Sequence, residues 1–237
     1  MNREVRHLKT PVRKAWQSFE PVLALAVIAF ALWMVFFRTP IEEQMGIVQK
    51  IFYFHLPAAY SMYLAWAICT VTSILYVVKR DDKFDIVSRA SAEVALVFGI
   101  MVMTTGPLWG KKAWGAYWVW DPRLTTAMVL TLIIMSYVIL RSLSDGEVIK
   151  KFSAALAIVG AAMIPLVHVS VVIWRGQHPS VLRRGGLAPE MLPPLLVCMT
   201  AFTIVFIVFL RKRVHLEKLR RTADEFTRLK QISNINN

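Results

Sequence analysis

The stretch "WGAYWVWDPR", from Trp114 to Arg123, has an unusual density of side chains that bind flat apolar molecules. It holds three tryptophans, a tyrosine, an aspartate and an arginine, and it lies between two long apolar segments. Trp114, Tyr117 and Trp118 stand at i, i+3 and i+4, and Asp121 at i+7, so a helical loop would align them on one stripe. Each aromatic side chain in such a stripe can bury about 150–250 Å².

Histidines on either side of this stretch supply possible metal ligands. His55 lies before it in "FHLPAAY", and His178 lies after it in "WRGQHPS". Neutral imidazole is a good ligand for zinc, copper and iron. Zinc needs a third or fourth protein ligand. A zinc site therefore remains possible, because neighbouring loops carry the carboxylates of Glu42, Glu43, Asp121 and Glu190.

The setting of the histidines favours haem over a bare metal ion. A porphyrin needs apolar faces and two axial ligands, which the tryptophans and histidines offer. It also needs basic groups for its propionates, and the candidates are Lys111, Lys112, Arg123, Arg183 and Arg184. His168 lies within a later apolar segment. It either lines the same site or, as a neutral imidazole, hydrogen-bonds a neighbouring helix.

Structural explanations for the same residues remain open. Tryptophans gather at membrane interfaces as anchors. Asp121 followed by Pro122 is typical of the N-cap and first-turn proline that open a helix. Pro57 likewise suits the first turn of a helix, which would place His55 just before that helix.

The elements that must position these residues are six apolar segments. The chain is 57% hydrophobic and 18% charged, and the hydrophobic residues are concentrated in blocks. Each block approaches the roughly 20 residues that cross a bilayer as a helix, and lipid leaves only helices or closed barrels. The sequence therefore predicts an all-α membrane protein, a six-transmembrane-helix bundle with no soluble domain. The blocks are Pro21 to Phe37, Ala58 to Val78, Val94 to Trp109, Leu124 to Leu140, Phe152 to Trp174 and Leu195 to Leu210.

The distribution of basic residues predicts the orientation. Of the 28 lysines and arginines, 20 fall in the two terminal regions and the second and fourth connections. Both termini are therefore expected in the cytoplasm. Residues 1–210 form the predicted membrane domain, with the tryptophan loop at 109–123 facing outward, and residues 211–237 form a basic tail. We expect the tail to favour anionic lipid rather than nucleic acid, because no RNA-binding motif accompanies it.

The two cysteines indicate neither a disulfide framework nor a zinc site, because Cys69 and Cys198 both fall inside apolar segments. The chain also lacks a C-x-x-C-H motif, so we expect no covalently attached haem.

The sequence "WGAYWVWDPRLTT" resembles the tryptophan-rich WWD motif, W-G-x-x-W-x-W-D, of haem-handling proteins in cytochrome c biogenesis. The matching residues are Trp114, Gly115, Trp118, Trp120 and Asp121. The segments "FHLPAA" and "WRGQHP" resemble the two histidine segments that flank the motif. With its six helices and short loops, nearly the whole chain is similar to the cytochrome c maturation protein C family, also called haem exporter protein C.

This resemblance implies a non-covalent haem b at the outer face of a bacterial inner membrane, with His55 and His178 as axial ligands. Around them it implies a haem site that includes the WWD residues, Tyr117, Arg123 and His168. The implied partners are a periplasmic haem chaperone, the ATPase and membrane subunits of an ABC-type complex, a small single-helix membrane protein and membrane lipid.

Other functions compete with haem presentation. A membrane b-type cytochrome would need histidine pairs within helices at two depths, and a haem lyase acting on apocytochrome would resemble longer relatives. The chain has no nucleotide site of its own, so we expect a transfer component rather than a conventional enzyme.

Overall fold

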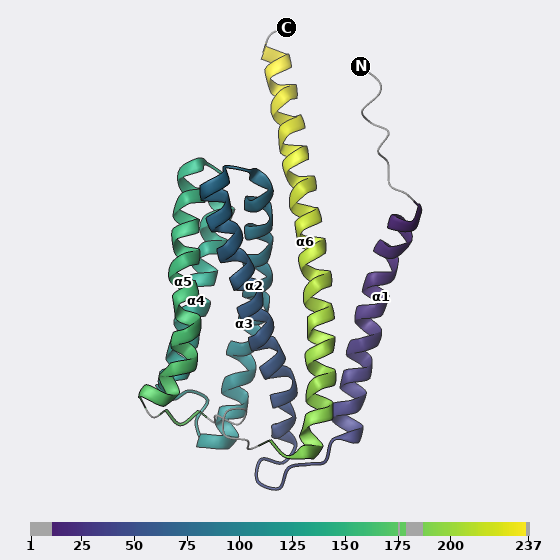
Figure 1. Ribbon diagram of the computed structural model, residues 1–237, viewed down its shortest axis with the longest axis vertical. Coiled ribbons are helices and arrows are strands. Elements are labelled where there is room, and N and C mark those ends of the chain that lie inside the picture. The colour runs from purple at the N-terminus through teal and green to yellow at the C-terminus, as the bar shows by residue number, and fades with distance from the viewer. Residues whose placement is uncertain (1–10, 175, 179–186, 236–237) are drawn as a thin grey trace.

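The computed structural model describes residues 11–174, 176–178 and 187–235, and within them six helices are long and apolar enough to cross a membrane (Figure 1). The predicted six-helix architecture is confirmed, no β-strand occurs among these residues, and the chain is a multi-pass membrane protein. The long helices are α1 (Pro11–Trp33), α2 (Phe52–Lys79), α3 (Asp82–Trp114), α4 (Pro122–Leu143), α5 (Glu147–Ile173) and α6 (Leu192–Ile235). Short turns flank them: a π-helical η1 (Met34–Arg38) and the 3-10 turns η2 (Ile47–Ile51) and η3 (Pro189–Met191).

The start of α2 differs from the predicted one. The 3-10 turn η2 runs directly into α2 at Phe52, so His55 lies within the helix and Pro57 lies in its second turn. The prediction that His55 precedes the helix is therefore wrong. Proline is a weaker stop signal here because membrane helices tolerate it where neighbouring groups compensate for the lost hydrogen bond.

The sixth helix passes without a break through the predicted boundary between membrane domain and tail. Its 44 residues give a length of about 66 Å at 1.5 Å per residue, against about 30 Å of hydrocarbon. Figure 1 accordingly shows α6 extending beyond the other helices. The boundary at residue 210 marks a change of composition, not of structure.

The helices form a four-helix group with a flanking pair. Figure 1 shows α6 between α1 and the group α2–α5. Small buried residues, such as Ala65 and Ala95, allow close packing of the helices in the group. Trp66 of α2 is fully buried against Gly160 of α5, where a Cβ atom would approach its indole nitrogen to 2.6 Å. A second cluster, which includes Ala31 of α1 and Cys198 of α6, joins the flanking pair.

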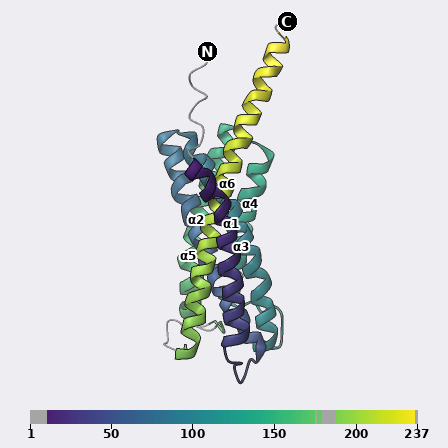
Figure 2. The same cartoon turned by 90° about the vertical axis from the view of Figure 1, so that its right-hand side faces the viewer.

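The two ends of the bundle have different characters. At one end α1 begins, α6 ends, and the α2–α3 and α4–α5 connections lie (Figure 2); we call it the basic end. The other end, called the cavity end, holds the tryptophan loop and the segments that carry His55 and His178. Cys69 and Cys198 are free and buried within helices, as predicted.

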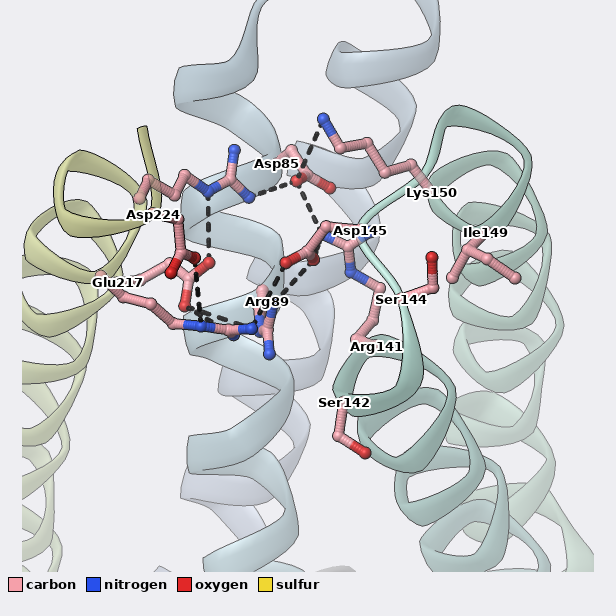
Figure 3. Close-up of polar contacts among 12 residues, drawn as sticks. Asp85, Arg89, Arg141, Ser142, Ser144, Asp145, Ile149, Lys150, Glu217 and Asp224 are labelled. Atoms are coloured by element: carbon pink, nitrogen blue, oxygen red, sulfur yellow. Dashed lines mark hydrogen bonds and ion pairs between the residues drawn. The ribbon is translucent and has the colours of Figure 1, made fainter. Parts of the chain in front are cut away.

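A buried cluster of ion pairs lies at the basic end and connects α6 to α3 and α4 (Figure 3). Asp85 of α3 is 3% exposed and pairs with Arg141 of α4 at 2.8 Å and with Arg221 of α6 at 2.5 Å. Arg89 pairs with Asp145 at 2.8 Å and lies 3.6 Å from Glu217 of α6. Charges in such a place are tolerated only when they are paired, so the cluster fixes how the basic part of α6 sits against the bundle.

Candidate functional site

A cavity of about 490 Å³ opens at the cavity end among α2, α3, α4 and α5. Its volume falls within the range of about 300–1,000 Å³ that is usual for ligand pockets. None of its lining residues belongs to α1 or α6 among the described residues. The site residues predicted from sequence that line it are His55, Trp114, Trp118, Arg123, His168 and His178.

The tryptophan loop builds one wall of the cavity in a different way from the predicted one. Gly115 takes a left-handed conformation (φ 77°) and ends α3, so residues 115–121 are not helical and the predicted helical stripe is wrong. Glycine reaches this conformation without a Cβ penalty, which makes it a strong helix stop. Trp114 and Trp118 still line the cavity, whereas Tyr117 and Trp120 are 58% and 76% exposed.

Two residues that were not predicted as site residues support the tryptophan-loop wall of the cavity. Trp109 lines the cavity, stands edge-on to Trp114 with ring centroids 5.6 Å apart, and donates its indole N–H to Gln49 at 3.1 Å. Gly110 leaves room for the Trp114 ring, because a Cβ atom there would lie 2.9 Å from it. The repeated Trp-Gly pairs, 109–110 and 114–115, were the available signal.

Asp121 connects the tryptophan loop to the segment that carries His178. It is 5% exposed and caps α4 by accepting from the Arg123 backbone N–H at 2.8 Å, as predicted. Its other oxygen accepts from the backbone N–H groups of Gln177 at 2.5 Å and His178 at 3.4 Å. Asp121 is not among the cavity-lining residues; its carboxylate holds the backbone that presents His178.

Replacing Gly176 with alanine is expected to disturb this connection. The new Cβ atom would lie 2.6 Å from the Asp121 carboxylate, a distance that real Cβ atoms essentially never show. Either the carboxylate or the Gln177–His178 segment must then shift, which disturbs the hydrogen bonds between them. We expect the variant to insert into membranes but to bind cavity ligands at least about 10-fold more weakly, the lower limit for loss of a ligand's supporting partner. Haem titration of the purified variant measures this loss. Gly146→Ala is the control, because a Cβ atom there meets only Ser144 at 3.6 Å; equal affinity in both variants would contradict the connection.

The three histidines occupy different parts of the cavity wall. His178 lies near Trp114, with ring centroids 6.4 Å apart. His168 donates Nδ1–H to the carbonyl of Ile164 in its own helix at 2.9 Å and lies against Tyr63, with centroids 5.1 Å apart. It thus lines the cavity and hydrogen-bonds its own helix rather than a neighbouring one. His55 contacts α3 through Thr105, at 2.8 Å from its Nδ1.

Among the residues that the structure describes, the positive charge in the cavity lining comes from Arg123. Lys111 is directed elsewhere: its ammonium group donates to the Gly115 carbonyl at 2.8 Å and lies 5.4 Å from the centroid of Tyr117. Lys112 is exposed and does not line the cavity. The other two predicted propionate partners, Arg183 and Arg184, lie outside the described residues.

The donor set fits an iron with two protein ligands better than a zinc ion. Among the described residues, no three histidine, cysteine, aspartate or glutamate side chains group to hold a metal ion. The carboxylates of Glu42, Glu43, Asp121 and Glu190, which had made zinc possible, therefore do not complete a zinc site with the histidines. Two imidazoles in a cavity walled by aromatic rings match the needs of a haem iron.

Comparison with known proteins decides the family. A family model described as "Heme exporter protein C" matches residues 7–228. The chain belongs to the haem exporter protein C family. It is 32% identical over 211 residues to the "Heme exporter protein C" of Bradyrhizobium diazoefficiens, covering 87% of this chain and 79% of that protein. The Escherichia coli K12 protein of the same description is 30% identical over 182 residues, which are 75% of this chain and 74% of that protein.

A relative outside bacteria gives the biological context in its own description. The "Putative cytochrome c biosynthesis ccmC-like mitochondrial protein" of Marchantia polymorpha is 28% identical over 184 residues, covering 76% of this chain and 78% of that protein. Membership of the haem exporter protein C family thus confirms the resemblance that the tryptophan-rich sequence indicated, and it makes haem the molecule to test in the cavity.

Proposed function

We propose that the chain binds haem b non-covalently in this cavity and presents it to a periplasmic haem chaperone during c-type cytochrome biogenesis. One observation carries the proposal: His55 and His178 come from segments far apart in sequence, yet both line one tryptophan-walled cavity. In this proposal they are the two axial ligands of the haem iron.

The other lining residues have roles that suit a porphyrin as cargo. Trp114 and Trp118 cover apolar macrocycle, and aromatic rings bury large areas with a defined geometry. Arg123 pairs with a propionate, because arginine forms strong charge-assisted bonds to carboxylates. Trp120 stands edge-on to Trp118, with centroids 5.8 Å apart, and its exposed face suits it to contact haem or the chaperone at the rim.

We place the chain in a bacterial inner membrane with the cavity end facing the periplasm. The excess of lysine and arginine at the basic end supports this orientation, since positively charged loops stay in the cytoplasm. The exposed apolar side chains on the helices, such as Leu25 and Val78, then face lipid.

The proposed partners follow from the family and from what the chain lacks. No nucleotide-binding motif occurs in the sequence, so energy for any release step must come from other subunits. These are the ATPase and membrane subunits of an ABC-type complex and a small single-helix membrane protein.

A membrane b-type cytochrome is the alternative that the structure brings closest, because His55 and His168 both lie in helices. Electron transfer across a bilayer needs haem groups at two depths. All three of the cavity histidines line one space at one end of the bundle, which suits presentation of a single haem to one side.

A transfer experiment tests the proposal. Spheroplasts that carry the haem-loaded protein are incubated with haem-free chaperone added outside, and haem on the chaperone is measured by absorption. The intact protein should deliver haem, and the Trp114→Ala, Trp118→Ala double variant should lose most of its bound haem beforehand. The Ile207→Ala variant, on the lipid-facing part of α6, should behave as the intact protein. Normal haem content in the double variant would mean that the tryptophans only anchor the loop. Failure of the haem-loaded intact protein to load the external chaperone would overturn the proposed presentation at the outer side.

A further inference from the structure

We propose that Thr105 is a positioning residue that fixes the tautomer of His55, so that Nδ1 carries the proton and Nε2 is left with its lone pair free. This inference rests on the proposed function in one respect, namely that His55 binds the haem iron. A neutral imidazole has one protonated and one unprotonated nitrogen, and only the unprotonated one can bind a metal. The tautomer therefore decides which edge of the ring can meet the iron.

The hydrogen bonds of Thr105 determine the direction of its contact with His55. The hydroxyl of Thr105 lies 2.7 Å from the carbonyl oxygen of Met101, one turn earlier in α3, and 2.8 Å from His55 Nδ1. A carbonyl oxygen can only accept, and a hydroxyl has a single proton. When that proton is donated to Met101, the Thr105 oxygen must accept from His55, which requires Nδ1–H.

The opposite arrangement is less favourable. If Thr105 donated to Nδ1, the proton of His55 would sit on Nε2, and no residue in the described part of the chain accepts from that nitrogen. The cavity lining is mostly apolar, so an N–H at Nε2 would have no protein acceptor among the described residues, and a missing hydrogen bond costs free energy. In the Nδ1–H form both protons of this small network have an acceptor, and only the lone pair of Nε2 is left without a partner.

The next residue of α3 fixes the orientation of the ring. A Cβ atom at Gly106 would lie 3.3 Å from Cε1 of His55, the carbon between the two nitrogens. The backbone of α3 thus packs closely against one edge of the imidazole while Thr105 holds Nδ1. Metal-binding histidines commonly have such a partner on the second nitrogen, which sets both the tautomer and the ring direction.

The tautomer can be measured without haem. Haem-free protein labelled with ¹⁵N at histidine is examined by NMR, and the His55 signals are assigned by their loss in His55→Ala. We expect a protonated Nδ1 and an unprotonated Nε2 for His55, and a mixture of tautomers in Thr105→Val. His168 provides an internal reference, because its Nδ1 bonds to Ile164 and should not change. A protonated Nε2 at His55 in the unmodified protein, or an unchanged His55 in Thr105→Val, would overturn the inference.

Haem titration then tests the consequence. Thr105→Val should weaken haem binding by about 10–100-fold, the usual effect of removing such a partner, and Thr105→Ser should restore the affinity because it keeps the hydroxyl. Thr104→Val is the matched control, since Thr104 makes the same bond within α3, to Ile100 at 2.8 Å, but is exposed. If no variant and not even the unmodified protein bound haem, the proposed function would fail while the tautomer result stood. Equal affinity in Thr105→Val and the unmodified protein would overturn the positioning role.

Discussion

If His55 and His178 are the axial ligands, as we propose, replacing either with alanine is expected to remove the low-spin bis-histidine spectrum of the haem-loaded protein. Both imidazoles line the same cavity, and with one of the two proposed axial ligands lost, the iron would keep a single bond to the protein. Removal of a supporting partner alone weakens metal binding by about 10–100-fold, so loss of the ligand itself should reach or exceed the upper end of that range. Absorption spectra and haem titration of the detergent-purified variants measure both effects.

Two other histidines serve as controls for this experiment. His168 lines the cavity, so His168→Ala should weaken binding modestly and keep the low-spin spectrum. His215 lies on α6 at the basic end, and His215→Ala should change neither the spectrum nor the affinity. A spectrum that survives in His178→Ala and disappears in His168→Ala would transfer the second ligand to α5 and contradict our assignment.

Replacing Asp85 with asparagine is expected to destabilise the folded protein by about 3–5 kcal/mol, the usual cost of breaking a buried ion pair by removing one partner. Asp85 is 3% exposed and is shared by Arg141 and Arg221. Without its charge, Arg141 remains 1% exposed, and its one remaining carboxylate partner in the described part of the chain is Asp145, at 3.2 Å. The free energy of unfolding, measured by titration with a denaturing detergent, should fall accordingly.

The matched control makes the same substitution four residues earlier. Asp81 pairs with Lys83 at 2.7 Å, but both side chains are well exposed, and exposed pairs contribute at most about 1 kcal/mol. Asp81 also caps α3, a role that asparagine performs equally well. If Asp81→Asn and Asp85→Asn lowered the free energy of unfolding equally, the buried cluster would have no special importance.

The six helices could be predicted because hydrophobic length is a strong local signal in a membrane protein. Helix ends were harder. Pro57 indicated a helix start, yet α2 begins at Phe52, because tertiary surroundings compensate for a proline that would break an isolated helix. At Gly115 the error was the opposite one. The prediction extended a helix through this glycine, but α3 ends there, so the expected stripe of aromatic residues along one helix face does not form.

The residues of the candidate site were predictable where chemistry is visible in the residue type, and not where it depends on contacts between helices. Histidine and tryptophan attract attention by themselves, so the predicted residues include most of the polar cavity lining. The role of Thr105 depends on the register of α2 against α3, which no local spacing reveals. Similarly, the cap formed by Asp121 follows from the adjacent proline, but its bonds to Gln177 and His178 join residues 56 and 57 positions apart.

The origin of the cavity walls has a consequence for how such proteins can diversify. Among the described residues the cavity lining comes from α2 to α5 and their connections, with nothing from α1 or α6, although α6 packs against α3 through Phe98 and Phe202. Substitutions on the lipid-facing sides of α1 and α6, such as at Leu25 and Ile207, therefore leave the residues that line the cavity unchanged. The outer faces of these two helices can therefore differ between relatives to suit neighbouring subunits while the cavity lining stays the same.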